Sequence, residues 1–335
     1  MNLVDVAFEL PKELEATCPP EARGIPRDGV RLLVSDAHSG ATEHHLFVEL
    51  PALLEPGDLL VVNDSATLPA ALEALRSDGT SLALHLSSRV SNTLWVVEPR
   101  GGALAGERLA LPHEGVATVV APVNPGNERL WYARLDVPEP IVEYLHRCGK
   151  PIRYAYLEGI YPIAAYQTIF ARTLGSAEMP SAGRPFAERT LIALRRRGVA
   201  LARITLHAGV SSAESHEPPQ PEPFAVPHAT ALAVNATRAA GKRVIAVGTT
   251  VTRALESAVV DGSVVASNGW TDLVVTPSRG VRAVDGIVTG FHEPRASHLA
   301  MLSAFAIPGV LERAYRDALE GGYLWHEFGD VHLIL

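Results

Sequence analysis

Apolar and polar positions are arranged along this chain in short blocks that predict an α/β fold. Val30 to Val34 and Leu59 to Val62 are apolar runs of strand length bounded by turn residues. After residue 138, segments with a helical period alternate with strand-like segments. These segments are Ala187 to Arg197 (helix), Ala200 to Leu206 (strand), Ala229 to Ala240 (helix), Arg243 to Val247 (strand) and Val251 to Val259 (helix). The alternation is typical of helices packed on a sheet of buried strands.

The stretch from about Ala70 to Leu135 has a different pattern, in which short β-like pieces are separated by glycine, proline and asparagine. These pieces are Ser81 to Leu86, Thr93 to Val97, Val116 to Val120 and Leu130 to Leu135. No helical pattern of convincing length interrupts them, which indicates a small all-β module. We therefore expect a large α/β domain formed by residues 1–69 and 138–335, with an inserted β domain at 70–137.

The composition of the 335-residue chain, with 47% hydrophobic and 20% charged residues, predicts a folded cytoplasmic protein. Its apolar runs are far shorter than the ~20 residues that cross a bilayer, and no basic-then-apolar leader precedes them. The two cysteines, Cys18 and Cys148, lie far apart and have no neighbouring histidine pair. We therefore expect neither a membrane segment nor a structural metal site.

The net charge of −8 argues against a broad basic surface that grips nucleic acid through many phosphates. The run Arg195-Arg196-Arg197 is a candidate for a local basic patch. We favour its interpretation as the solvated last turn of a helix that ends at Gly198, where cations suit the helix dipole.

Three strand-like segments end in small or polar residues. They are Ile204 to Gly209, Val244 to Thr250 and Ile287 to His292. In an α/β fold the carboxyl ends of such strands face one rim, where ligands usually bind. We expect His207, Thr249, Thr250 and His292 to converge there. A histidine that follows a strand is more often a hydrogen-bonded structural residue than a catalyst. Both histidines are therefore candidates for catalysis with a structural role as the alternative.

The turn at Gly248 carries the most specific local chemistry. Gly248 permits a tight turn, and Thr249 or Thr250 can cap the helix that follows. The free N–H groups of such a helix start can bind an anion, although the threonines would cap the helix without any ligand. Arg253 either pairs with Glu256 on the same helix or holds a ligand carboxylate.

The usual phosphate, dinucleotide and serine-nucleophile motifs are absent from the sequence, which has no G-x-x-x-x-G-K-[ST], no G-x-G-x-x-G after a strand and no G-x-S-x-G. The residues alone therefore predict an α/β enzyme with a ligand site on one rim of its sheet.

A longer pattern carries a family resemblance. Residues Gly241 to Ala258 read G-K-R-V-I-A-V-G-T-T-V-T-R-A-L-E-S-A and closely resemble the G-x-R-V-I-A-V-G-T-T-x-x-R-x-L-E-S segment of the S-adenosylmethionine:tRNA ribosyltransferase-isomerases of queuosine biosynthesis. Other matching segments follow in the family's order as far as Phe328-Gly329-Asp330. They are Pro56 to Asn63, Tyr166 to Thr168, Pro180 to Gly183, Thr205 to Gly209, Gly269 to Leu273, Phe291-His292 and Met301 to Phe305.

The resemblance implies a barrel-like α/β large domain that carries an inserted β-barrel. It also implies a reaction in which the ribosyl part of S-adenosylmethionine is transferred and isomerised onto 7-aminomethyl-7-deazaguanine in a tRNA anticodon. Epoxyqueuosine remains in the RNA, and adenine and methionine leave. S-adenosylmethionine is then a substrate, and we expect no further cofactor and no metal, because the chemistry needs acid/base groups and fixed polar donors.

Carried over position by position, the resemblance implies catalytic or orienting roles for His207, His292 and Glu222. Thr249, Thr250 and Arg253 are expected to hold the methionine or ribose end of the donor. The expected substrate-binding residues are Asn63, Tyr166, Gln167, Thr168, Ser181, Ala182, Gly183, Gly209, Gly248, Thr249, Thr250, Arg253, Thr289 and Phe291.

The chain departs from the family pattern at several places, including Gly209 to Ala213, Gln220 to Glu222 and Thr289 to His292. Two further departures bear most directly on RNA binding and catalysis. After Asn63 the family usually reads Asn-Thr-Arg-Val-Ile-Pro-Ala-Arg, whereas residues Asp64 to Ala71 contain neither arginine. Two fewer cations weaken the contribution of this segment to RNA phosphate binding, so tRNA is an expected partner with a reduced basic surface. The family's Leu-His-Phe is Arg184-Pro185-Phe186 here, which removes a histidine at Pro185.

These departures leave two alternatives to the tRNA reaction. In the first, the protein transfers the ribosyl group of S-adenosylmethionine to a small-molecule acceptor, or cleaves S-adenosylmethionine with such a molecule. The other is a non-catalytic nucleoside-binding protein, because the same fold supports each of these functions.

Overall fold

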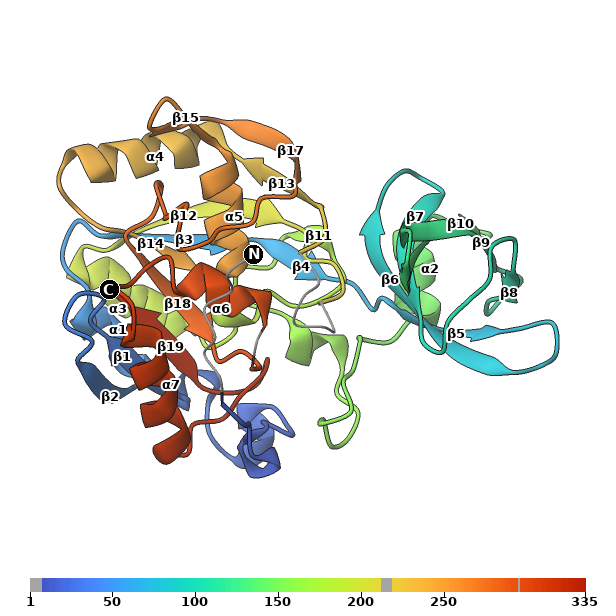
Figure 1. Cartoon of the computed structure of the whole chain (residues 1–335), viewed down its shortest axis with the longest axis horizontal. Helices are drawn as coiled ribbons and strands as arrows, with labels where there is room; N and C mark the ends of the chain where they lie inside the picture. Colours follow the sequence, from blue (N-terminus) through green and yellow to red (C-terminus); the bar gives the residue numbers. More distant parts are fainter. Residues whose placement is uncertain (1–7, 212–218, 295) are drawn as a thin grey trace.

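A computed structural model describes residues 8–211, 219–294 and 296–335 of the chain. Figure 1 shows a layered α/β part and, at the other end of the long axis, a smaller β-barrel. The expected α/β class with an inserted all-β unit is therefore confirmed.

The α/β part is organised around a nine-stranded sheet with the order β17-β13-β12-β3-β14-β18-β19-β1-β2. Its strands are β1 (Arg31–Ser35), β2 (Thr42–Leu46), β3 (Leu59–Asn63), β12 (Ala200–Leu206), β13 (Glu222–Val226), β14 (Val244–Val247), β17 (Ser267–Thr271), β18 (Gly286–Gly290) and β19 (Val331–Ile334). Strands β12, β3, β14 and β18 are mutually parallel, so their carboxyl ends lie at one edge of the sheet.

The expectation of a barrel-like large domain is refined by the way this sheet ends. Among the described strands, β17 pairs only with β13 and β2 pairs only with β1, so the sheet is open. Most residues of both edge strands are exposed or half-buried, and β2 carries Glu43, His44 and His45. Polar, solvated edge strands are a common way to end a sheet without further pairing.

Every residue of β3 and β14 is buried, because helices cover both faces of the sheet. Leu59 and Val61 belong to a core that includes residues of α4, α5 and α7, whereas Leu60 and Val62 belong to a core that includes residues of α1 and α3. The helices are α1 (Leu50–Leu53), α3 (Glu188–Arg197), α4 (His228–Ala239), α5 (Thr249–Ser257), α6 (Ser297–Leu302) and α7 (Val310–Glu320). The predicted strands and helices of this part all form, with shifts of one or two residues at their ends.

The inserted unit is a closed barrel with the strand order β10-β7-β6-β5-β8-β9. Its strands are β5 (Ala71–Leu75), β6 (Ser81–Arg89), β7 (Leu94–Pro99), β8 (Arg108–Ala110), β9 (Val116–Asn124) and β10 (Asn127–Asp136). Four of them were predicted, and β5 and β8 were not. Helix α2 (Ile141–Cys148) buries Ile141, Tyr144 and Leu145 in the barrel core. The division at 70–137 stays a prediction, and this packing favours adding α2 to the inserted unit.

A short parallel ribbon connects the two parts. The chain leaves β3 through β4 (Ser65–Thr67) and returns through β11 (Thr173–Ser176), which pairs with β4. Two minor strands, β15 (Val259–Val260) and β16 (Ser263–Val264), form a separate hairpin. Among the described residues, no helix combines the length and apolar character required to cross a membrane.

The arginine run lies at the sheet edge opposite to the carboxyl ends. Helix α3 ends at Arg197, and Gly198 adopts a φ of 84° directly before β12 begins at Ala200. The three arginines are exposed in the last helical turn. Their position supports the interpretation as a solvated helix end.

Candidate active site

A cavity of about 480 Å³ lies at the carboxyl ends of β12, β14 and β18, where the sheet faces the barrel. Its size is typical of pockets that enclose a nucleoside-sized ligand. Glu98 and Arg100 line it from the barrel side, and residues 151–156 close it between the two parts.

Twelve of the expected site residues line this cavity. They are Tyr166, Ser181, Ala182, Gly209, Glu222, Gly248, Thr249, Thr250, Arg253, Thr289, Phe291 and His292. The structure thus brings together Thr249, Thr250 and His292 as the strand-end pattern predicted. Their contacts with a substrate stay predictions.

The start of helix α5 forms one wall of the cavity. Gly248 is its N-cap residue with φ 98° and ψ 160°, a conformation that essentially only glycine adopts. The prediction of a threonine cap is wrong, because the helix already begins at Thr249 and no side chain caps it. No described group accepts a hydrogen bond from the backbone N–H of Thr249 or Thr250. These donors and the helix dipole favour an anion at this point.

Arg253 and Glu222 form an ion pair in the same wall. Arg253 also donates to the carbonyl oxygens of Thr271 at 2.9 Å and Leu273 at 3.2 Å, so most of its donors are satisfied by the protein. Glu222 accepts a hydrogen bond from Gly209 N at 2.8 Å. Burial raises the pKa of Glu222, and the charge of Arg253 opposes that effect. Arg253 therefore fixes Glu222 in the pocket.

The suggested pairing of Arg253 with Glu256 does not form. Glu256 instead contacts Arg279 at 2.6 Å and accepts a hydrogen bond from Ala283 N at 2.7 Å. Arg253 points to the opposite side, where β13 supplies Glu222. Helical spacing alone could not show that each side chain has a better partner on another element.

Two histidines form a second wall. His292, directly after β18, lies 2.9 Å from Thr289 Oγ1 through its Nε2 atom. Its ring stacks on the ring of His298. Burial lowers the pKa of His292 well below its ordinary value, and it lowers the pKa of His298 to about 4. Both imidazoles are therefore neutral at physiological pH, and His298 was not identified from the sequence.

The far end of the cavity contains a cluster that the sequence did not reveal. Tyr154 donates a hydrogen bond to Glu178, and Tyr156 donates one to Glu327. The ring of His326 stacks on that of Tyr156, with centroids 3.9 Å apart. Burial raises the pKa of Glu178 and raises that of Glu327 to about 7. The alternation of Tyr154 and Tyr156 and the position of Glu178 beside the Pro180–Gly183 segment were the available signals.

His207 lies behind the wall and does not line the cavity. Its Nδ1 atom is 2.7 Å from Ser65 Oγ, and Ser65 Oγ is 2.6 Å from Ser176 Oγ. A Cβ atom at Gly175 would come within 2.6 Å of its ring. His207 thus contacts both strands of the β4–β11 ribbon, and burial lowers its pKa. A catalytic role for His207 stays a prediction, and the contacts favour a positioning role.

The four other expected residues that do not line the cavity support its walls. Asn63 donates to Thr250 Oγ1 at 3.2 Å and to Leu206 O at 2.8 Å. Gln167 binds the backbone N and O of Thr67, and Thr168 Oγ1 accepts from Phe170 N. A Cβ atom at Gly183 would lie 3.3 Å from the Thr168 methyl group, so this position leaves little room for a side chain.

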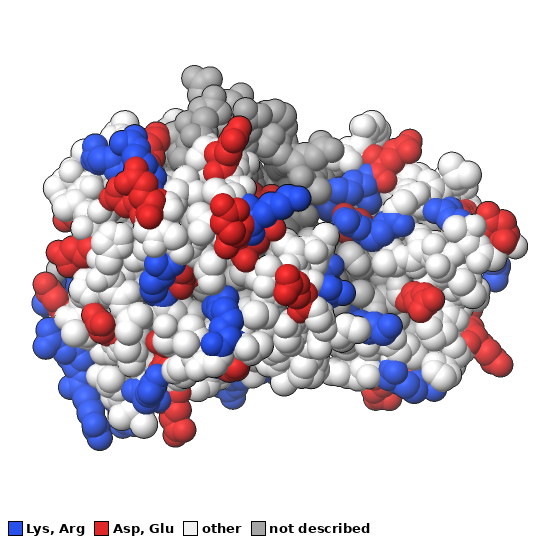
Figure 2. Space-filling view, turned by 90° about the horizontal axis from the view of Figure 1, so that it is seen from below, with Lys and Arg blue, Asp and Glu red and all other residues white. Residues whose placement is uncertain are grey.

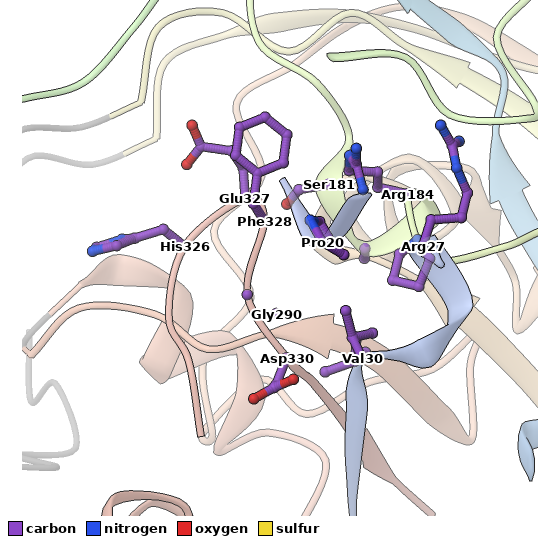
Figure 3. Close-up of a pocket in the computed structure, with 14 residues that line it drawn as sticks. Pro20, Arg27, Val30, Ser181, Arg184, Gly290, His326, Glu327, Phe328 and Asp330 are labelled. Carbon is purple, nitrogen blue, oxygen red and sulfur yellow. The ribbon is translucent and has the colours of Figure 1, made fainter. Parts of the chain in front are cut away.

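Pro185, where the family has histidine, lines a separate small cavity of about 10 Å³. Figure 3 shows Arg27 and Arg184 on one side of it and the carboxylate of Glu327 projecting away from them. Arg184 is 3% exposed and donates to Ala165 O and Glu21. The small cavity shares Ser181, His326 and Glu327 with the large one, so a histidine at this position would lie behind their common wall.

Charge on the surface is mixed. Figure 2 shows Lys and Arg interspersed with Asp and Glu, and no continuous basic band crosses the described residues of this face. Within the described ranges, no group of three His, Cys, Asp or Glu side chains is arranged to hold a metal ion.

Together, the open α/β sheet, the inserted barrel and the titratable groups at the carboxyl edge define a ligand-binding α/β protein with a composite pocket. The model of the queuosine biosynthesis protein family matches residues 3–334, and the chain belongs to this family.

The chain is similar to full-length relatives in several bacteria. It is 39% identical to the S-adenosylmethionine:tRNA ribosyltransferase-isomerase of Symbiobacterium thermophilum and 37% identical to that of Moorella thermoacetica, with 100% of each chain covered. It also resembles the crystal structure of S-adenosylmethionine tRNA ribosyltransferase from Thermotoga maritima, with 31% identity, a TM-score of 0.57 and coverage of 99% of this chain and 100% of the other.

Proposed function

We propose that this chain transfers and isomerises the ribosyl group of S-adenosylmethionine onto 7-aminomethyl-7-deazaguanine in tRNA. The products are epoxyqueuosine in the RNA, adenine and methionine. The observation that carries the proposal is the match along the whole chain, at 37–39% identity, to relatives named for this activity. The partners are then S-adenosylmethionine, as a substrate rather than a cofactor, and tRNA, and the cytoplasm is the proposed location.

The donor end of the proposed complex is the start of helix α5. The free N–H groups of Thr249 and Thr250 suit the methionine carboxylate, because they combine two donors with the positive end of the helix dipole. Gly248 permits a close approach, since it has no side chain at the mouth of the turn. Glu222, fixed by Arg253, can accept a hydrogen bond from a ribose hydroxyl or from adenine.

The chemistry needs a group that removes a proton next to the sulfonium. His292 is the proposed group, because it lines the cavity and its lowered pKa keeps it neutral and able to accept a proton. Thr289 fixes the orientation of its ring. His298 shields the other face of the imidazole and lies in the same wall.

The test is incubation of the purified protein with S-adenosylmethionine, with and without tRNA that carries 7-aminomethyl-7-deazaguanine, followed by quantification of adenine and methionine. The proposal predicts equal amounts of both products, and only when the modified tRNA is present. Equal release without RNA would instead support a small-molecule reaction. No release under either condition would support a non-catalytic nucleoside-binding protein.

A further inference from the structure

The far end of the large cavity has the properties of a second subsite. Three aromatic rings, those of Tyr154, Tyr156 and His326, form a parallel stack that we call the aromatic shelf. Tyr154 and Tyr156 have centroids 5.8 Å apart and planes at 15°, and Tyr156 and His326 have planes at 8°. All three line the cavity and keep part of their surface accessible. Flat accessible rings of this kind stack well on a nucleobase.

Two carboxyl groups, Glu178 and Glu327, accompany the aromatic shelf, and both are only half-buried. Glu178 accepts hydrogen bonds from Tyr154 and from Ser211 N at 2.9 Å. Glu327 accepts one from Tyr156 at its Oε2 atom. No other described residue donates to Oε1 of Glu327, and Figure 3 shows this carboxylate extending away from Arg27 and Arg184.

These two carboxyl groups differ from four recessed carboxylates elsewhere in the molecule. Asp58, Glu98, Glu222 and Glu256 each contact an arginine. Among the described residues, no cationic side chain forms an ion pair with Glu178 or Glu327. Burial raises the pKa of both, and Glu178 raises that of Glu327 further. A recessed carboxylate is stabilised by an ion-pair partner, which a cationic ligand would supply.

We propose that the aromatic shelf and Glu327 form the subsite for the acceptor base, a planar nucleobase that bears a primary amine. The base stacks on the shelf, and its amine binds Oε1 of Glu327. At the other end of the aromatic shelf, the hydrogen bond to Glu178 holds the ring of Tyr154 in place. The inference rests on the proposed function, and it adds which residues select the acceptor.

The subsite combines a segment that follows the barrel with a loop of the α/β part. Tyr154 and Tyr156 belong to the segment that leaves the barrel, whereas His326 and Glu327 belong to the loop before β19. The residues proposed to bind S-adenosylmethionine and those proposed to bind the acceptor base therefore line one continuous cavity. S-adenosylmethionine would lie at the sheet edge, and the acceptor base between the two parts of the chain.

The test compares Glu327→Gln with the parent in binding and in turnover. Two tRNAs are used, one with 7-aminomethyl-7-deazaguanine and one with unmodified guanine at the same position, and their affinities are measured by competition. We expect the parent to prefer the modified tRNA by about tenfold or more, which is typical of a charged hydrogen bond. Glu327→Gln should lose this preference and keep its affinity for S-adenosylmethionine within twofold.

The matched control is Glu158→Gln, which removes the same charge from an exposed residue close to Tyr156. It should keep the parent's preference. Tyr156→Phe, which removes only the hydrogen bond to Glu327, should reduce the preference by a few-fold and serves if Glu327→Gln does not fold.

The inference is contradicted if the parent shows no preference, if Glu327→Gln keeps it within twofold, or if S-adenosylmethionine binding is lost in parallel. The binding ratio needs no turnover. A parent protein that prefers the modified tRNA and releases no adenine would therefore contradict the proposed reaction without contradicting the subsite.

Discussion

The imidazole rings of His292 and His298 lie parallel in the pocket wall, with centroids 4.5 Å apart and planes at 7°. Two stacked imidazoles cannot both be charged at low cost, so each disfavours protonation of the other. His298 contributes in this way to the lowered pKa of His292, after burial. The pair thus supplies a neutral imidazole in the cavity that the start of helix α5 also lines.

We expect His292→Ala to lower kcat by about 100-fold or more, as for other general bases. The loop should keep its conformation, because His292 is held through its backbone, with Trp325 Nε1 donating to His292 O at 3.0 Å. Adenine release at saturating S-adenosylmethionine and tRNA measures the effect. Turnover within a few-fold of the parent would exclude His292 as the base.

His207→Ala provides the comparison with a histidine outside the cavity. Loss of the 2.7 Å contact with Ser65 should lower the free energy of unfolding by about 1 kcal/mol, with a smaller loss of turnover than for His292→Ala. Thermal unfolding and adenine release measure the two effects. An unchanged stability with turnover abolished would show that His207 is catalytic, in agreement with the sequence-based prediction.

The Arg253–Glu222 ion pair should contribute to stability as well as to binding. Removal of one partner leaves a buried charge, so Glu222→Ala should lower the free energy of unfolding by about 3 kcal/mol. The control is Glu55→Ala, which breaks an exposed contact of 3.7 Å with Lys242 and should cost below about 1 kcal/mol. Urea denaturation measures both, and equal effects would contradict the importance of the buried pair.

Gly248→Ala tests the turn before helix α5. The φ of 98° is strained for alanine, and the new Cβ atom would lie 3.3 Å from Ala182 Cβ. We expect a loss of about 1–3 kcal/mol of stability and weaker binding of S-adenosylmethionine. Gly241→Ala, with φ 65° and open space around it, should cost about 1 kcal/mol and leave binding unchanged. Isothermal titration of both variants with S-adenosylmethionine separates the effect of backbone strain from the effect on binding. Equal affinities of the two variants would contradict a role of the Gly248 turn in binding.

Glu327 should make stability depend on pH. Its pKa of about 7 in the folded protein exceeds the ordinary 4.5, so folding favours the protonated carboxyl group. This contribution to stability is fully present below about pH 4.5 and is lost as the pH rises through 7. Glu327→Gln should match the parent near pH 4.5 and exceed its free energy of unfolding near pH 8, by up to about 3 kcal/mol. Denaturation at both pH values measures this difference. A variant that is less stable than the parent near pH 8 would show that the carboxylate is ionised and stabilising.

The sequence predicted the strands, the helices and the donor side of the site because these depend on local patterns. Buried runs such as Leu59–Val62 and the Gly248 turn are specified by neighbouring residues. The partners of Arg253 and the stack of Tyr156 on His326 were not predicted, because they join segments far apart in the chain. Only the fold brings such residues together. His207 shows the converse, since its position after a strand places it behind the wall instead of in the cavity.

The central claim is that the ribosyl group of S-adenosylmethionine, and not its methyl group, enters the RNA. The most direct test uses two labelled donors, one with ¹³C in the ribose and one with ¹³C in the methyl group, followed by mass spectrometry of the digested tRNA. The account predicts ribose carbon in the modified nucleoside and methyl carbon in free methionine. Methyl label in the RNA, or RNA without either label, would contradict it.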